Sequence, residues 1–170
     1  FSPFFGESVP DEDVWLLTTV SLLSTDRKGE IVYKGIEGET REYNGTDYTY
    51  TGIADCEVTE NEDGTVFYDY TIRDDIKFAD GEPMTIDDVI FSMERGMEMP
   101  MAVPSFARVT GVEKVDDSHV KLILDGPYPE FLFAMALPTA GILSKAAFES
   151  MGEEAYAQKP VTTGPYQVSD

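Results

Sequence analysis

The sequence has few cysteines, no long apolar run and few basic residues, and each shortage excludes a class of protein. Cys56 is the only cysteine, so no disulfide can form within the chain. The longest apolar stretch, residues 131–137, is far shorter than the ~20 residues that a membrane-spanning helix needs. No charged segment followed by an apolar one stands at the start, so we expect that an export signal was removed or that the chain is a fragment.

Basic residues are outnumbered by acidic ones. There are 12 Lys and Arg against 33 Asp and Glu, which gives a formal net charge of −21. Such a field repels phosphate backbones and anionic headgroups, so we expect no nucleic acid among the partners. An acidic surface mostly serves solubility and identifies no ligand.

Motifs for catalysis, metal binding and phosphate binding are also missing. His119, the single histidine, lies beside an expected turn with no nucleophile pattern nearby. Acidic pairs such as Asp74-Asp75 follow from composition, and adjacent side chains on a strand or helix point to different sides. No zinc spacing, calcium loop or glycine-rich phosphate loop occurs. The sequence therefore predicts no enzyme, no metal site and no cofactor.

The residues that are present are sufficient for a folded core. Of the 170 residues, 42% are hydrophobic and 12% aromatic, and the length fits a single domain. Cys56 lies in an alternating apolar segment without a basic neighbour, which favours burial as a small hydrophobic residue over a reactive thiol.

Hairpins and helices alternate along the chain. Alternation with period two predicts hairpins from strands 53–59 and 66–73, and from strands 109–115 and 119–124. Apolar spacing and capping residues predict helices. We expect these helices over residues 11–23, 86–95, 130–137 and 145–151, with Gly96 and Gly152 as terminators. A short strand at 30–34 precedes a glycine-rich stretch, 35–52, which is either a loop or an extra hairpin. These elements predict one α+β unit, a small mixed sheet built of β-hairpins with flanking helices.

One stretch resembles a known family. Residues 70–95 are similar to the segment in which extracellular solute-binding proteins of family 5, the peptide and nickel group, carry a Lys-(Phe/Trp)-x-Asp-Gly-x-Pro turn and a Thr-Ala-x-Asp-Val helix. The matching residues are Arg73, Lys77, Phe78, Asp80, Gly81, Pro83, Thr85, Asp88, Val89, Phe91 and Ser92. Residues 112–129 and 163–166 also resemble family segments. Thr162 stands where a glycine is usual, and residues 35–52 look like an insertion.

The resemblance implies an accessory subdomain of a periplasmic-binding-protein type II lobe. Residues 1–30 would be the arm and helix of the first lobe, 31–160 the accessory α+β subdomain and 161–170 the strand that returns to the first lobe. Family members are much longer, so the second lobe would be absent and the chain a fragment. Strand edges left uncovered would then allow self-association.

The implied function is that of the substrate-binding component of an ABC importer, a solute-binding lipoprotein or periplasmic protein. It would capture peptides or a related small solute outside the membrane, between two lobes that close, and deliver it to permease subunits. The alternative is a secreted or surface structural α+β module with no ligand of its own.

Two segments hold the candidate ligand-binding residues that the resemblance implies. Glu7, Ser8 and Val9 match a loop that approaches the ligand backbone in oligopeptide-binding members, although an ordinary helix lead-in fits them equally well. Ser105 and Phe106 follow a methionine-rich segment, 97–101, that fits either an adaptable contact surface or core packing.

Overall fold

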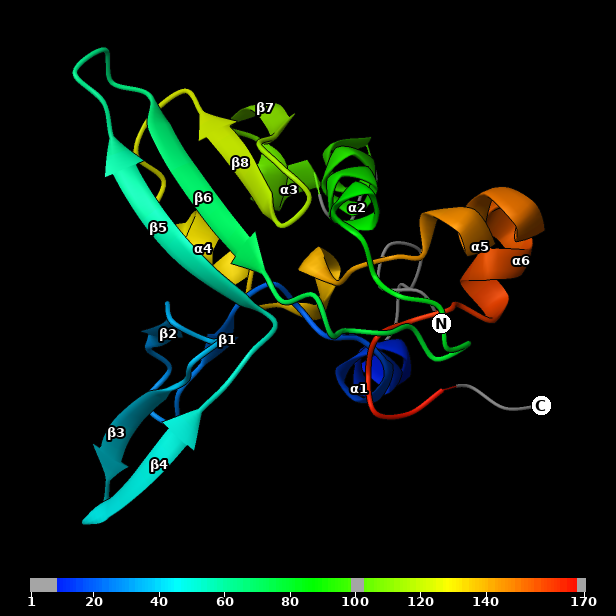
Figure 1. The fold of residues 1–170 in the computed structure, drawn as a ribbon, viewed down its shortest axis with the longest axis horizontal. Coiled ribbons are helices and arrows are strands. Elements are labelled where there is room, and N and C mark those ends of the chain that lie inside the picture. The colour runs from blue at the N-terminus through cyan, green and yellow to red at the C-terminus, as the bar shows by residue number, and fades with distance from the viewer. Residues whose placement is uncertain (1–8, 99–102, 168–170) are drawn as a thin grey trace.

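An antiparallel four-stranded sheet forms the centre of the fold. The computed structural model describes residues 9–98 and 103–167. The strands lie in the order β5 (Ala54–Glu60), β6 (Val66–Ile72), β8 (His119–Leu124) and β7 (Val109–Lys114) (Figure 1). Both predicted hairpins are confirmed. Every pairing between the described strands is antiparallel, so the prediction of a mixed sheet is wrong, because hairpins join only antiparallel strands.

The alternation of apolar residues places one face of the sheet in the core. Tyr68 pairs with Leu122 and Tyr70 with Val120, and all four side chains are buried. Phe131 packs edge-on against Tyr68, with 4.9 Å between the ring centroids. This face therefore carries the main hydrophobic cluster of the protein.

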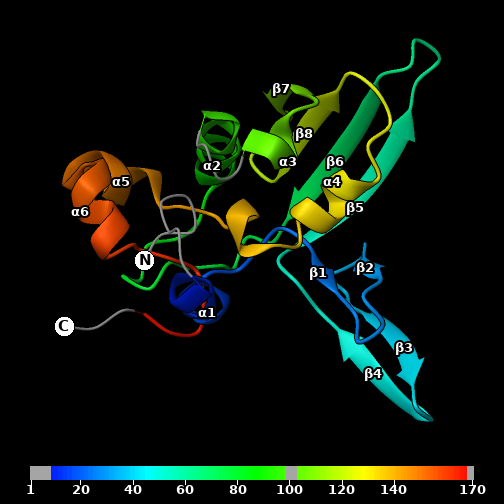
Figure 2. The ribbon, with the colours of Figure 1, turned by 180° about the vertical axis from the view of Figure 1, so that it is seen from behind.

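Three helices contribute to this core: α2 (Ile86–Glu98), α3 (Val103–Phe106) and α4 (Glu130–Ala134) (Figure 2). The prediction that Gly96 ends α2 is wrong, because the helix continues past it to Glu98. A Cβ at Gly96 would lie 2.7 Å from the ring of Phe106, so glycine here serves close packing of α2 on α3.

The N-terminal segment differs from its prediction at the end of the helix. Helix α1 spans Val9–Thr18 instead of residues 11–23. The residues that follow leave the helix, and the N–H of Leu23 donates to the carbonyl of Met135 over 3.0 Å. This backbone pairing between Leu23 and Met135 ends α1 before the predicted residue 23.

Two short strands, β1 (Ser24–Thr25) and β2 (Ile31–Val32), flank a turn at residues 26–29. The stretch 35–52 contains a hairpin, β3 (Glu39–Tyr43) and β4 (Thr46–Tyr50), which extends away from the main sheet in Figures 1 and 2. Asn44 and Gly45 join its strands with φ of 52° and 77°. Two positive φ values in a row are typical of the tight turns that Asn-Gly favours.

The C-terminal part is helical. It contains η1 (Pro138–Ala140), α5 (Lys145–Met151) and α6 (Glu153–Gln158), and the sequence did not predict α6. The hydroxyl of Ser144 caps α5 by accepting a hydrogen bond from the N–H of Ala147. Gly152 ends α5 with φ of 81°, so its prediction as a terminator is confirmed. None of the helices in the described ranges is both long and apolar enough to cross a membrane.

Candidate functional site

The candidate ligand-binding residues lie mostly where the structure gives no side chain. Glu7 and Ser8 fall outside the described residues, and Val9 and Ser105 are placed only as backbone in α1 and α3. Phe106 is 3% exposed, and its ring packs edge-on against Phe131. The ligand-binding role of these residues stays a prediction.

The segment that resembles family 5 folds into β6, a tight turn and α2. In the turn, the N–H of Phe78 donates to the carbonyl of Glu82 over 2.9 Å, and Gly81 adopts φ of 93°. The carboxylate of Asp80 accepts from the N–H of Glu82 over 3.0 Å. Phe78 itself is buried. The Asp-Gly pair therefore shapes the turn, because Asp caps it and glycine tolerates the positive φ.

Thr85 and Asp88 form a capping box at the start of α2. One Asp88 oxygen accepts from the N–H of Thr85 over 2.9 Å and from its hydroxyl over 2.7 Å. The other oxygen accepts from the N–H of Lys145 over 2.9 Å. A single carboxylate, 7% exposed, thus joins the N-termini of α2 and α5.

Ser92 and Tyr156 extend this network. The Ser92 hydroxyl donates to the carbonyl of Asp88 over 2.7 Å and accepts from the N–H of Leu143 over 2.8 Å. The Tyr156 hydroxyl donates to the carbonyl of Val161 over 2.6 Å, and burial raises the pKa of this phenol. The motif residues of α2 therefore hold the backbone of the C-terminal part in place.

The turn within the family-like segment 70–95 and the tail at residues 162–166 meet in space. The N–H of Ala79, in the turn, donates to the carbonyl of Thr162 over 2.9 Å, and the N–H of Gly164 donates to the carbonyl of Thr18 over 2.8 Å. A Cβ at Gly164 would lie 2.3 Å from the carbonyl carbon of Thr18. Only glycine can pass this close to the end of α1. We call this crossing of residues 162–164 over α1 and the turn the tail junction.

Beside the hydrogen-bond network of Asp88 lies an open hollow of about 670 Å³, between the turn, α2 and α5. Its charged lining residues are Asp80, Glu82, Asp87, Asp88, Lys145 and Glu149. Across the described parts of the chain, no group of three or more His, Cys, Asp or Glu side chains is arranged to hold a metal ion. Since Asp80 and Asp88 already accept backbone hydrogen bonds, two of these carboxylates serve the fold.

His119 and Cys56 lack the geometry of catalytic groups. The hydroxyl of Ser118 and the carboxylate of Asp116 both contact Nδ1 of His119, at 3.0 and 2.7 Å. A Ser-His-Asp relay needs the two partners on different ring nitrogens, so this turn cannot act as one. Burial raises the pKa of the Cys56 thiol to about 12, which keeps it protonated and unreactive.

Comparison with known proteins identifies the family. Residues 49–170 match the model of the bacterial extracellular solute-binding proteins, family 5 Middle. The chain is 29% identical over 113 residues to the glutathione-binding protein GsiB of Escherichia coli K12, covering 65% of this chain and 22% of GsiB. It is 26% identical over 140 residues to the periplasmic oligopeptide-binding protein OppA of the same strain, covering 70% of this chain and 25% of OppA.

The fold agrees with the sequence match. The oligopeptide-binding protein AppA from Bacillus subtilis, solved in complex with a nonapeptide, superposes with a TM-score of 0.73 at 21% identity, covering 100% of this chain and 31% of AppA. The expected α+β fold of the periplasmic-binding-protein type is thereby confirmed. The chain spans about a quarter of the length of the two curated relatives. It belongs to family 5 of the bacterial extracellular solute-binding proteins.

Proposed function

We propose that the chain is part of the substrate-binding component of an ABC importer that captures peptides or a related small solute outside the membrane. The family match over residues 49–170 is the observation that carries this proposal. The similarity to AppA over the whole chain supports it. Permease subunits of the importer are the proposed partners. The proposed location is the extracellular face of the cell membrane, with the protein held by a lipid anchor, or the periplasm.

In this proposal, residues 31–160 are the accessory subdomain, and residues 1–30 and 161–170 belong to the first lobe. The tail junction supports the division, because the segment after residue 160 returns to α1 across the Gly164–Thr18 hydrogen bond. The chain would thus leave and re-enter the first lobe at one place. This is the arrangement expected for a subdomain inserted into a lobe.

The ligand contacts would come from the two segments that the resemblance indicates. Glu7, Ser8 and Val9 would approach the ligand backbone, and Ser105 would face the ligand from α3. Phe106 is the remaining candidate, and its buried ring also packs in the core, where it holds α3 in place. No catalytic step is part of this proposal, because the family is one of solute-binding proteins.

Calorimetry with mixed di- to pentapeptides tests the proposal. We expect no measurable heat from the 170-residue chain, because half of a closing site loses the contacts that favour closure. A family-length polypeptide that contains these residues should bind peptides with micromolar or better affinity. Absence of binding to that polypeptide would favour the alternative, a structural module without a ligand.

A further inference from the structure

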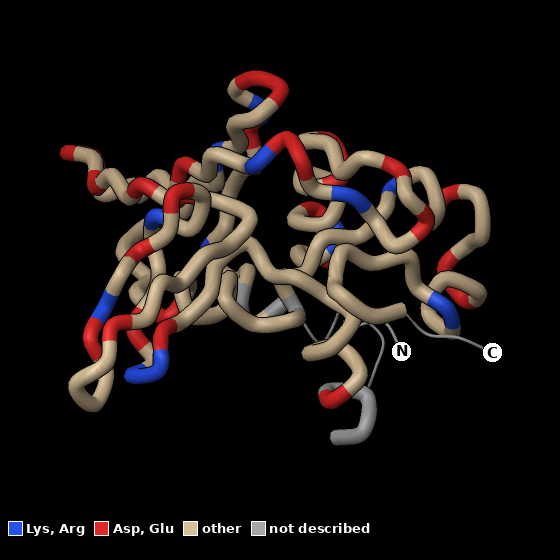
Figure 3. The backbone as a smooth tube through the Cα atoms, turned by 60° about the horizontal axis from the view of Figure 1, so that its bottom comes forward, with Lys and Arg blue, Asp and Glu red and all other residues tan. Residues whose placement is uncertain are grey.

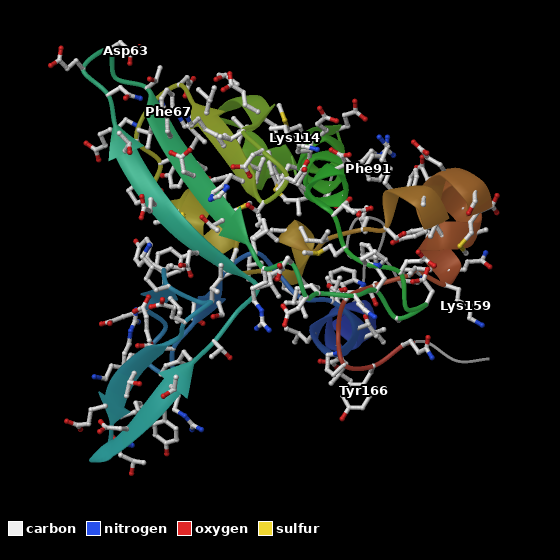
Figure 4. All side chains as sticks on the ribbon, in the orientation of Figure 1. Asp63, Phe67, Phe91, Lys114, Lys159 and Tyr166 are labelled. Carbon is white, nitrogen blue, oxygen red and sulfur yellow. The ribbon has the colours of Figure 1, made fainter. Side chains whose placement is uncertain are left out.

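The turn at the tip of the β3–β4 hairpin consists of an asparagine followed by a glycine. Asn44 and Gly45 are both exposed, with positive φ values of 52° and 77°. The space around Gly45 is open, since a Cβ built there would meet no atom within 4 Å. Figure 4 shows the hairpin and its side chains extending away from the main sheet and the helices. This pair of residues is therefore accessible to water.

An Asn-Gly pair contains both reactants of an intramolecular substitution. The main-chain nitrogen of the glycine attacks the side-chain carbonyl carbon of the asparagine, Cγ, and closes a five-membered imide ring. The N–Cγ bond forms, the Cγ–Nδ2 bond breaks, and the amide leaves as ammonia with the proton of the glycine nitrogen. Proximity within one chain favours this attack, and glycine has no side chain to obstruct it.

Few contacts hold the two reactants in place at this tip. The N–H of Gly45 donates to a carboxylate oxygen of Glu42 over 2.9 Å, and Glu42 is itself exposed. The side chain of Asn44 makes no hydrogen bond with any residue that the structure describes. An exposed hydrogen bond is readily exchanged for one to water. The core therefore locks neither reactant.

Ring closure requires rotation of the main chain at Asn44, so the turn has to open first. Between Arg41 and the turn, the hairpin is closed by two residue pairs. Among the strands that the structure describes, β3 and β4 pair only with each other. Two-stranded hairpins are marginally stable, and local opening of such segments costs little free energy. The tip is therefore able to open while the main sheet stays folded.

We propose that Asn44 is a site of spontaneous deamidation, at which the turn is converted to aspartate and isoaspartate. Water opens the imide at either of its carbonyl carbons. Opening at Cγ leaves aspartate with an unchanged main chain. Opening at the main-chain carbonyl leaves isoaspartate, whose main chain runs through Cβ and Cγ and is one methylene longer. This modification is independent of the proposed function.

The two products differ in their effect on the hairpin. Each adds one carboxylate, and Figure 3 shows that acidic residues are already distributed over the backbone of this chain of net charge −21. The added charge therefore changes the field little. The extra methylene of isoaspartate falls between Tyr43 and Thr46, which pair across the turn. A two-residue turn depends on a fixed backbone geometry, so isoaspartate should open the tip.

The chain contains its own control, because Asn61 is its other asparagine. Glu62 follows it in place of glycine, and this side chain obstructs the approach to the main-chain nitrogen. The N–H of Asn61 donates to the carbonyl of Thr65 over 2.9 Å, and its side-chain amide donates to the Thr65 hydroxyl over 3.0 Å. Asn61 should therefore react far more slowly than Asn44.

Incubation of the 170-residue chain at pH 8, followed by peptide mapping with mass spectrometry, tests the proposal. We expect the peptide that contains Asn44 to gain about one dalton, at a rate within an order of magnitude of that of a free peptide of residues 39–50. Electron-transfer fragmentation should identify both aspartate and isoaspartate. The peptide that contains Asn61 should stay unchanged. An intact Asn44 after complete conversion of the free peptide would overturn the proposal.

The variant Asn44→Gln tests the route of the reaction. It keeps a side-chain amide, but the ring would have six members and close far more slowly, so we expect no product at this position. Loss of the Gln amide at the wild-type rate would point to direct attack by water and would overturn the imide route.

The variant Asn44→Asp tests the consequence for the hairpin, because it carries the added charge on an unchanged main chain. The chain that contains isoaspartate is first separated by chromatography. Its hydrogen exchange over residues 39–50 should be several-fold faster than that of Asn44→Asp, whereas residues 54–60 should exchange equally in both. Equal exchange over the hairpin would contradict the lengthened turn.

Discussion

Asp88 accepts hydrogen bonds on both carboxylate oxygens, from Thr85 at the start of α2 and from Lys145 at the start of α5. Sequence spacing predicts the first partner, since a capping box joins residues three apart. The second partner lies 57 residues further along the chain and depends on the tertiary fold. At the scale of residues, local partners could therefore be predicted and distant ones could not.

Asp88→Ala should destabilise the chain by about 1–3 kcal/mol, because it leaves two backbone N–H groups without their acceptor. Urea unfolding followed by circular dichroism measures the change. Asp87→Ala is the control. Its exposed ion pair with Lys114 contributes little, so the expected change is within about 0.5 kcal/mol. Equal effects of the two substitutions would contradict this role of Asp88.

Cys56 should react with iodoacetamide far more slowly in the folded chain than in the unfolded chain at pH 8. Burial raises the pKa of its thiol to about 12, so the folded chain contains almost no thiolate at this pH. Mass spectrometry of quenched samples, with and without urea, measures both rates. Similar rates would show that Cys56 is accessible.

At the scale of elements, the β3–β4 hairpin depends on contacts with the turn at residues 26–29. Arg41 Nη1 lies 2.9 Å from a carboxylate oxygen of Asp26, whose side chain is almost completely buried. Burial by itself would raise the pKa of Asp26. The hydrogen bonds from Arg41 and from the N–H groups of Glu30 and Lys28 outweigh this effect and lower it. The sequence left this stretch open between a loop and a hairpin, because Asp26, the partner that anchors Arg41, lies outside the hairpin itself.

Asp26→Asn should destabilise the chain at neutral pH, and the difference from wild type should shrink in acid. The folded pKa of Asp26 lies below its ordinary value of 3.8, so its contribution is present above that pH and is lost as the pH falls through the folded value. Urea unfolding of both chains between pH 7 and pH 2 measures the difference. A difference that does not change with pH would contradict the ion pair as its source.

Element ends were predicted less well than elements. Period two predicted both hairpins of the main sheet, because one face of each is buried. The predicted ends of α1 and α2 were wrong, because tertiary contacts determine where these helices end. Leu23 pairs with Met135 instead of extending α1, and Gly96 packs under Phe106 inside α2. Neither contact leaves a signal in local sequence.

At the scale of the whole molecule, the tail junction brings together α1, the Asp-Gly turn and the segment after residue 160. The family resemblance predicted that the tail returns to the first lobe, yet which atoms meet was visible only in the structure. The candidate ligand-binding residues could be named only from the resemblance. Most of these candidates have no described side chain, so the chemistry that would select a ligand is not visible. The sequence therefore does not identify the ligand.

Gly164→Ala should destabilise the chain by about 1–3 kcal/mol, because the added methyl group would overlap the backbone of Thr18 at the tail junction. Gly111→Ala is the matched control. Its Cβ would lie 3.6 Å from Ile123 Cδ1, an ordinary contact, so stability should change little. Thermal unfolding of the three chains compares them, and an unchanged melting temperature for Gly164→Ala would contradict the close crossing.

We propose that these residues build part of a two-lobed protein that closes on a small molecule. Small-angle X-ray scattering of the family-length polypeptide, with and without a peptide that it binds, tests this most directly. We predict that the radius of gyration falls on binding, whereas that of the 170-residue chain stays constant under the same peptide. A peptide that binds without any change in the radius of gyration of the longer polypeptide would contradict the account.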